Sequence, residues 1–189
     1  MKRKILGFFL LLFALLVAFG IMFAPTFFTK NVSRNVQNKS FDLEHILSGE
    51  KSLELIFFGY AGCRDICSLH LASLAGFYEK LPFEIQNSLD VRFIDISSPA
   101  DVTLTQRFAE YFHKDFKGLY LEASSLREYT KLFGVFFARS MSEPTEFDHT
   151  AHLYLVSKKE NQKQIRYVYT SYPYDFSQIQ NDIEELLNE

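Results

Sequence analysis

A continuous apolar run from Leu53 to Gly59, broken only by Glu54, is the clearest pattern in the chain. Such a run is typical of a strand that is buried on both faces at the centre of a sheet. Beyond a glycine-bearing turn, large apolar side chains recur at helical spacing, and these are Leu71, Leu74, Tyr78 and Leu81. The pattern therefore predicts a strand, a turn and a helix, around which we expect the rest of the domain to be built.

The remaining apolar periodicities predict an alternation of strands and helices. Period-two segments indicate strands, helical spacing indicates amphipathic helices, and a polar stretch between two strands indicates a hairpin. The expected elements are strands at 91–97, 118–122, 149–157 and 165–171, and helices at 101–113, 125–134 and from 175 onward. This order predicts an α/β layer structure, with helices on both faces of a central mixed sheet and an antiparallel hairpin at one side.

Local capping signals set the expected ends of two helices. The segment Ser125-Leu126-Arg127-Glu128 has the capping-box pattern, in which two side chains satisfy free N–H groups at a helix start. Gly134 can adopt the left-handed conformation that closes a helix, and Asp175 is a suitable N-cap. We therefore expect one helix to begin at the capping box and end at Gly134, and the last helix to begin at Asp175.

The beginning of the chain has the pattern of a membrane anchor. Residues 2–4 are Lys-Arg-Lys, and residues 5–29 contain no charged side chain, a length that can cross a bilayer. A cleaved signal peptide has a shorter apolar region that ends at small residues, a pattern that residues 18–20 match only weakly. The sequence favours an uncleaved anchor over a cleaved signal, and the basic residues before it favour a cytoplasmic N-terminus.

These patterns divide the chain into four parts. We expect a cytoplasmic tail at residues 1–4, a transmembrane anchor at 5–28, a polar linker at 29–45 and one folded domain at 46–189. The domain is expected on the periplasmic or outer side of the cytoplasmic membrane, where disulfides persist. A chain of 189 residues is long enough for a sizeable core, and its net charge of −3 argues against a nucleic-acid partner.

The two cysteines of the chain, Cys63 and Cys67, follow the first predicted strand. We expect Cys63 at or just before the helix start, where partial positive charge lowers the pKa of a thiol. Arg64 adds positive charge there, and Asp65 partly offsets it. Cys67, four residues on, is expected one turn along the same helix face.

Thiolates at a strand–helix junction bind metal or attack disulfides. Cysteines at this junction of an α/β order are typical of the thioredoxin-like class, which predicts a thioredoxin-like three-layer fold. Redox thioredoxins have two residues between their cysteines, whereas this chain has three. A CxxxC pair is by itself equally consistent with a structural disulfide.

His149 is the candidate third ligand, because it lies where a loop enters a predicted strand. Functional groups gather at strand ends in open α/β folds. His152, three residues on, is expected to face the opposite side of the strand and therefore not to share an ion with His149. Two thiolates and one imidazole form a soft, three-coordinate set that suits copper, whereas structural zinc needs a fourth ligand.

Two other residues are weaker candidates for the site. His70 follows Cys67 on the helix and is within reach of the cysteines, and Asp148 is a candidate for orienting the imidazole of His149. The remaining histidines are expected at the surface or partly buried; they are His45, His113 and His152.

The segment 58–67, Phe-Gly-Tyr-Ala-Gly-Cys-Arg-Asp-Ile-Cys, together with Asp-His-Thr at 148–150, resembles the Sco/SenC family. The resemblance extends over about residues 53 to 189 and includes the segments 116–119 and 129–135. It implies a membrane-anchored, thioredoxin-like protein that binds a copper ion and helps to assemble the binuclear copper centre of cytochrome c oxidase. The ligand-type residues Cys63, Cys67 and His149 are present, while Arg64 and Ser68 stand where the family usually has prolines.

Two functions from different classes remain open. One is a copper metallochaperone that serves the copper-containing subunit of cytochrome c oxidase or another copper protein. The other is a membrane-anchored thiol–disulfide oxidoreductase that keeps target cysteines reduced, with Cys63 and Cys67 as the redox-active pair. Both use the two cysteines, and only copper carriage requires His149.

Overall fold

The computed structural model describes residues 13, 34–41, 51–97, 102–143, 145–159 and 162–189. The predicted tail at 1–4 and the predicted anchor at 5–28 lie outside this part of the chain, apart from Phe13. Among the residues that are described, no helix combines the length and the apolar character needed to cross a bilayer.

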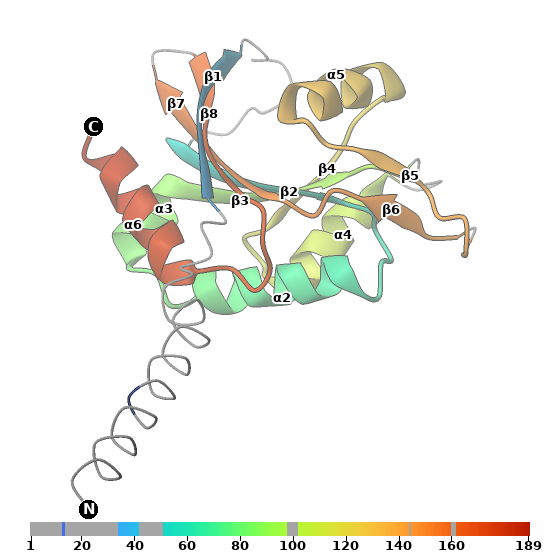
Figure 1. Cartoon of the computed structure of the whole chain (residues 1–189), viewed down its shortest axis with the longest axis horizontal. Helices are drawn as coiled ribbons and strands as arrows, with labels where there is room; N and C mark the ends of the chain where they lie inside the picture. Colours follow the sequence, from blue (N-terminus) through green and yellow to red (C-terminus); the bar gives the residue numbers. More distant parts are fainter. Residues whose placement is uncertain (1–12, 14–33, 42–50, 98–101, 144, 160–161) are drawn as a thin grey trace, which may run out of the picture. The chain divides into compact units, whose positions relative to one another are not determined.

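A six-stranded mixed sheet forms the centre of the domain, with the strand order β1-β8-β7-β2-β3-β4 (Figure 1). Its strands are β1 (Arg34–Phe41), β2 (Leu53–Gly59), β3 (Leu89–Asp95), β4 (Lys117–Tyr120), β7 (Leu153–Lys159) and β8 (Gln162–Tyr169). Neighbours among β2, β3 and β4 are parallel, and the pairs β2–β7, β7–β8 and β8–β1 are antiparallel. Every residue of β2 is buried, as the continuous apolar run predicts.

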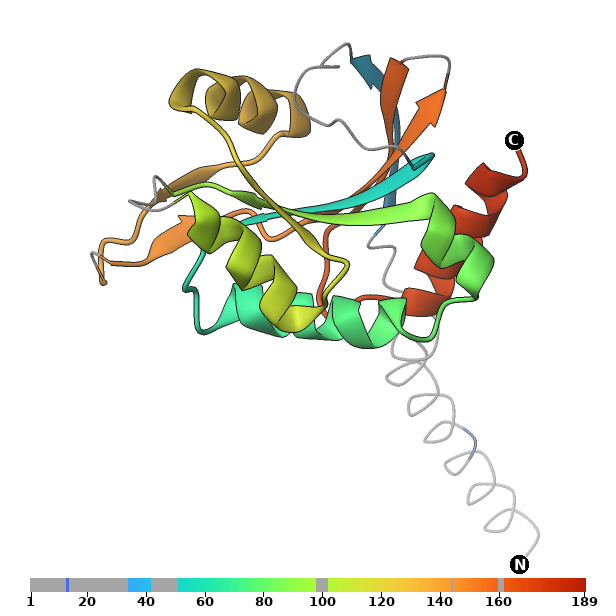
Figure 2. The ribbon, with the colours of Figure 1, turned by 180° about the vertical axis from the view of Figure 1, so that it is seen from behind.

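Helices cover both faces of this sheet. Helices α2 (Ile66–Tyr78) and α4 (Thr103–Phe112) lie along one face, and α5 (Ala123–Phe133) covers the other, as Figures 1 and 2 show from opposite sides. Two more helices are α3 (Phe83–Ser88) and α6 (Phe176–Leu187). The arrangement confirms the predicted α/β fold with helices on both faces and an antiparallel hairpin at one side.

Two adjacent phenylalanines of β2 fix the helices on either face of the sheet. Successive side chains of a strand point to opposite faces. Phe57 therefore stacks against His70 of α2, with ring centroids 5.1 Å apart, while Phe58 contacts Phe133 of α5 at 5.3 Å. Both phenylalanines are fully buried, and burial of each is worth about 1.5–3 kcal/mol. The strand thus determines where α2, which carries Cys67, lies against the sheet.

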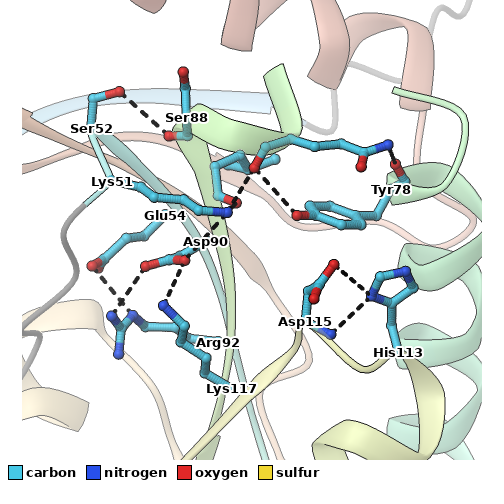
Figure 3. Close-up of polar contacts among 12 residues, drawn as sticks. Lys51, Ser52, Glu54, Tyr78, Ser88, Asp90, Arg92, His113, Asp115 and Lys117 are labelled. Atoms are coloured by element: carbon cyan, nitrogen blue, oxygen red, sulfur yellow. Dashed lines mark hydrogen bonds and ion pairs between the residues drawn. The ribbon is translucent and has the colours of Figure 1, made fainter. Parts of the chain in front are cut away.

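Glu54, the charged residue in the apolar run, belongs to a buried ion network at the amino ends of β2 and β3 (Figure 3). Its Oε1 atom lies 2.7 Å from Lys163 Nζ and 3.3 Å from Arg92 Nε. Asp90 Oδ2 lies 3.3 Å from Arg92 Nη2, and Asp90 Oδ1 lies 2.8 Å from Lys117 Nζ. Removal of one partner from such a network leaves an uncompensated buried charge, which costs about 3–5 kcal/mol. The network lies at the opposite end of the two strands from the cysteines.

The structure corrects the predicted linker at 29–45, because residues 34–41 form strand β1. β1 pairs with β8 and is tied to α6 by an ion pair of 2.8 Å between Arg34 and Asp182. Most of its side chains are exposed at the edge of the sheet, so the strand has no apolar alternation that reveals it in the sequence. The folded domain therefore includes residues before 46.

Two helix starts show where capping signals succeed and fail. Asp175 is the N-cap of α6, and its Oδ1 atom accepts a hydrogen bond from the Gln178 N–H at 3.1 Å, as predicted. The predicted start of α5 at the capping box is wrong, because α5 begins at Ala123, two residues before Ser125. Its N-cap is Glu122, whose side chain makes no capping hydrogen bond. Gly134 ends α5 in the left-handed conformation, with φ of 67°, as predicted.

The predicted strand at 149–157 is divided in two. Residues Phe147–His149 form β6, which pairs with β5 (Phe137–Arg139) in a separate two-stranded sheet, and β7 begins only at Leu153. The predicted loop between the last two strands is also too long, since β7 extends to Lys159 and β8 starts at Gln162. His149 therefore lies on the β5–β6 hairpin rather than at the start of a central strand.

Candidate metal centre

The first cysteine lies in the turn between β2 and α2. Gly62 adopts φ of 95°, and the Cys63 N–H donates to the Tyr60 carbonyl at 3.2 Å, so the chain turns sharply here. Helix α2 begins at Ile66, which places Cys63 just before the helix, as predicted. The further prediction that both cysteines share a helix face is wrong, because only Cys67 is helical.

Cys67 packs against the end of the central strand. Its side chain is fully buried, and a Cβ atom placed on Gly59 would lie 2.8 Å from the Cys67 sulfur and 2.9 Å from Phe93 Cε2. These distances are shorter than carbon and sulfur atoms tolerate, so the sulfur occupies the space that only a glycine leaves free. Gly59 was not singled out by the sequence, because this contact exists only in three dimensions.

The two sulfurs are chemically unequal. The Cys67 thiol donates to the Cys63 sulfur, and this hydrogen bond is the main cause that lowers the pKa of Cys63 to about 6. Burial opposes the shift, while the backbone N–H groups of Cys67 and Asp65 and the nearby His149 lower the pKa further. The Cys67 N–H lies 3.4 Å from the Cys63 sulfur. The same thiol–sulfur bond, with burial, raises the pKa of Cys67.

The imidazole of His149 reaches the second sulfur. Its Nε2 atom lies 3.3 Å from Cys67 Sγ, and its Nδ1 atom lies 3.2 Å from the Thr150 carbonyl oxygen. A carbonyl only accepts, so Nδ1 carries the hydrogen in the neutral ring, and the Nε2 lone pair faces the sulfur. The hypothesis that Asp148 orients the ring is wrong, since the backbone of Thr150 does so and the side chain of Asp148 is exposed.

The hairpin brings this histidine to the cysteines. Figure 1 shows β5 and β6 beside the turn from β2 to α2. The ring of His149 meets Phe57 and Tyr60 edge-on, with centroids 6.3 Å and 6.2 Å apart. The structure thus gathers Cys63, Cys67 and His149, the three predicted ligands, from two distant stretches of the chain. Within the described residues, no group of three or more His, Cys, Asp or Glu side chains has the arrangement of a formed metal site.

His70 has a different role from the one considered for it. It is buried against aromatic rings, with Tyr172 stacked at 4.5 Å, and its Nδ1 atom lies 2.5 Å from the Tyr174 hydroxyl. Burial, with a smaller contribution from His149, lowers the pKa of His70 to about 4. His70 is therefore a neutral packing residue at physiological pH.

Asp95 is a site residue that the sequence reasoning missed. It is fully buried at the carboxyl end of β3, and its Oδ2 atom accepts from the Ala61 N–H at 3.2 Å and from Thr105 Oγ1 at 2.9 Å. The carboxylate therefore connects the cysteine turn to β3 and α4. The sequence does place Asp95 near the end of the second predicted strand. Parallel strands bring their carboxyl ends together, so this position could have indicated a residue of the site.

An open pocket of about 460 Å³ gives access to the site. Cys63 and His149 line it together with Tyr60 and Arg64, and residues of the β5–β6 hairpin complete its wall. Cys67 does not line this pocket, and its side chain is fully buried, while Cys63 is 4% exposed. A reagent or partner that enters the pocket therefore meets Cys63 first.

Alkylation of the reduced protein is expected to show the difference in pKa between Cys63 and Cys67. The rate with iodoacetamide should rise with pH to half its maximum near pH 6, the pKa of Cys63, because the thiolate is the reactive form. Modification should fall on Cys63, because Cys63 lines the pocket, whereas Cys67 does not and has a raised pKa. Mass spectrometry of the products identifies the residue, and the unfolded protein serves as the control. A midpoint near the ordinary value of 9.0 would contradict the proposed hydrogen bonding.

The fold and the site together define a thioredoxin-like protein with a cysteine pair at the end of its central strand and a histidine on an adjacent hairpin. The model of the SCO1/SenC family matches residues 37–188, and the chain belongs to this family. The SCO2-like protein RC0895 of Rickettsia conorii is 29% identical over 123 residues, which are 62% of this chain and 58% of that protein. The chain thus spans less than two thirds of the length of this curated relative.

Solved structures of family members share the fold. Apo Sco1 from Thermus thermophilus is 29% identical, with a TM-score of 0.61 over 80% of this chain and 92% of that one. Copper-bound ScoI of Arabidopsis thaliana is 19% identical, with a TM-score of 0.61 over 72% and 84%. The BsSco structure, 17% identical with a TM-score of 0.57 over 82% and 95%, concerns a disulfide switch in a member of the Sco family of cytochrome c oxidase assembly proteins.

Proposed function

We propose that this protein is a copper metallochaperone in which Cys63, Cys67 and His149 hold one copper ion as cargo. The observation that carries the proposal is the 3.3 Å approach of His149 Nε2 to Cys67 Sγ, between residues 82 positions apart in the chain. The imidazole brings a nitrogen donor to the cysteine pair, and a three-ligand copper site requires this third donor.

The donor set fits copper by its chemistry. Cys63 is already a thiolate at neutral pH, and Cys67 supplies a second thiolate when it loses its proton to the solvent on binding. His149 adds a nitrogen whose second ring position is held by a backbone carbonyl. Two soft sulfurs and one imidazole suit copper, and a set of only three ligands leaves the ion open to a partner. The copper bound to ScoI of Arabidopsis thaliana supports this assignment.

The recipient we propose is the copper-containing subunit of cytochrome c oxidase, with delivery to its binuclear copper centre. Membership of the SCO1/SenC family and the assembly role of the Sco proteins, to which BsSco belongs, support this recipient. We further propose that residues 5–28 anchor the protein in the cytoplasmic membrane and that the folded domain lies on the periplasmic or outer side. The uncharged run after residues 2–4 supports the anchor.

A second candidate function is thiol–disulfide exchange with a target protein. The observation in its favour is the asymmetric pair, in which the thiol with the lowered pKa lines the pocket and the fully buried thiol with the raised pKa does not. This is the arrangement that a disulfide-reducing enzyme uses for attack and resolution. Copper carriage and thiol exchange differ in their need for His149, which allows one variant to separate them.

His149→Ala is expected to weaken copper binding by about 100-fold while thiol–disulfide exchange continues. Structural metal sites bind with about 10–16 kcal/mol shared among four ligands, so one ligand is worth roughly 3 kcal/mol. Copper titration of the purified full-length protein against a competing chelator measures the affinity. His152→Ala is the matched control, because it removes a partly buried histidine three residues away that contacts Tyr154 rather than a sulfur. Unchanged affinity in His149→Ala would favour the oxidoreductase.

A further inference from the structure

We infer that Ser68 and Asp95 are positioning residues that hold the Cys63 turn in its dithiol geometry and so favour the reduced form of the cysteine pair. The inference rests on the proposed function because it concerns the regulation of the same two cysteines. It requires no copper, however, and its test uses the metal-free protein.

Hydrogen bonds hold the chain on both sides of Cys63. After it, the Ser68 hydroxyl donates to the Cys63 carbonyl oxygen at 2.5 Å. Before it, the Ala61 N–H donates to Asp95 Oδ2 at 3.2 Å. The two contacts come from different elements, since Ser68 belongs to α2 and Asp95 ends β3. The short turn that carries Cys63 is therefore held by hydrogen bonds at two points, one to α2 and one to β3.

Asp95, which holds the Ala61 N–H from β3, is itself held rigidly. Asp95 is fully buried, and its Oδ1 atom accepts from the Ser97 N–H at 2.8 Å and from the Ser97 hydroxyl at 2.6 Å. Its Oδ2 atom also accepts from Thr105 Oγ1 at 2.9 Å. A carboxylate with both oxygens occupied in this way has no freedom to follow a movement of Ala61.

Oxidation would have to move Cys63 rather than Cys67. Cys67 is held in helix α2 with its side chain fully buried, and its sulfur lies so close to Gly59 that a Cβ atom there would come within 2.8 Å of it. The Cys63 sulfur instead lies in front of the helix, where it accepts the Cys67 N–H at 3.4 Å. A disulfide requires the two sulfurs to approach to about 2.05 Å. Cys63 must therefore move from its position between the hydrogen bonds made by Ala61 and Ser68.

The chemical step is a two-electron exchange. The two thiols together lose two protons and two electrons, one sulfur–sulfur bond forms, and the electrons reduce the disulfide of an external dithiol reagent. Hydrogen bonds that are stronger before this step than after it shift the equilibrium toward the dithiol. The cysteine pair therefore stays in the dithiol form, which is the form that can bind an ion.

Ser68→Ala is expected to shift the dithiol–disulfide equilibrium of the metal-free, full-length protein about fivefold toward the disulfide. This is the effect of one ordinary hydrogen bond, and it equals about 20 mV for a two-electron couple. Equilibration with oxidised and reduced dithiothreitol, followed by thiol trapping, measures the constant. Ser73→Ala is the matched control on the same helix, because that hydroxyl contacts Tyr172 at 2.8 Å and not the turn. Ser68→Thr, which keeps the hydroxyl, should restore the wild-type constant.

Asp95→Asn should shift the same constant in the same direction, because an amide has one accepting oxygen and cannot accept from the Ala61 N–H and the Ser97 N–H at once. Denaturant unfolding of the oxidised and reduced forms separates positioning from a structural role. Positioning predicts that each variant destabilises the reduced form more than the oxidised form. Equal destabilisation of both forms, with an unchanged redox constant, would overturn the inference. A redox shift in a protein that binds no copper would instead contradict only the proposed function.

Discussion

Cys67→Ser is expected to abolish tight copper binding, with the affinity reduced by more than about 100-fold, which corresponds to at least about 3 kcal/mol. A serine hydroxyl stays protonated at neutral pH and is a hard donor, so the substitution removes both the charge and the softness that favour copper. Cys63→Ser should have the same effect, because each sulfur is one of only two soft ligands in the proposed set. Chelator competition with the full-length protein measures the loss.

The matched control for the cysteine variants is Met141→Leu. Met141 is a fully exposed sulfur-containing residue between Ser140 and Ser142, which both line the pocket over the site. Its replacement should leave the copper affinity unchanged if binding depends on the cysteine pair rather than on any nearby sulfur. Stoichiometric copper binding by both cysteine variants would show that the ion is held elsewhere.

Gly59→Ala is expected to destabilise the protein by about 1–3 kcal/mol, the usual cost of an extra group in a packed core. The new methyl would lie 2.8 Å from the Cys67 sulfur and 2.9 Å from Phe93, so one of these side chains must move. Displacement of the sulfur should also weaken copper binding, although no ligand has been removed. Denaturant unfolding and copper titration of the same preparation measure the two effects.

Gly76→Ala adds the same methyl group, but it is expected to raise the stability of the protein rather than lower it. Gly76 lies in α2, and apart from its chain neighbours and the adjacent backbone of the helix, no atom in the described part of the chain would come within 4 Å of its added methyl. Alanine is the better helix former by about 1 kcal/mol, so this variant should be more stable than the wild type and bind copper normally. Equal stability of the two variants would contradict the packing argument at Gly59.

The centre of the fold was predictable because its signals are local and strong. The apolar run at 53–59 is a buried strand as expected, and Gly134 and Asp175 end and begin helices where their backbone chemistry predicts. Strand β1 was missed because it is an exposed edge strand held by pairing with β8 and by Arg34. Its residues resemble a polar linker until the partner strand is known.

The sequence indicated the three candidate ligands, whose roles stay a prediction, but it did not indicate the residues that position them. Cys63, Cys67 and His149 are residue types with few alternatives, and the structure brings them together. The residues that position them act through backbone atoms and through space. Thr150 holds the imidazole with its carbonyl, and Asp95 holds the turn through the Ala61 N–H. Such contacts depend on the three-dimensional path of the chain and leave no spacing rule in the sequence.

The most direct test of the central claim is copper-edge X-ray absorption of the full-length protein loaded with one equivalent of reduced copper. The three-ligand site predicts two sulfur scatterers and one imidazole nitrogen around the ion, because Cys67 Sγ and His149 Nε2 already lie 3.3 Å apart beside the Cys63 thiolate. A first shell without sulfur, or with two sulfurs and no imidazole, would contradict this ligand set.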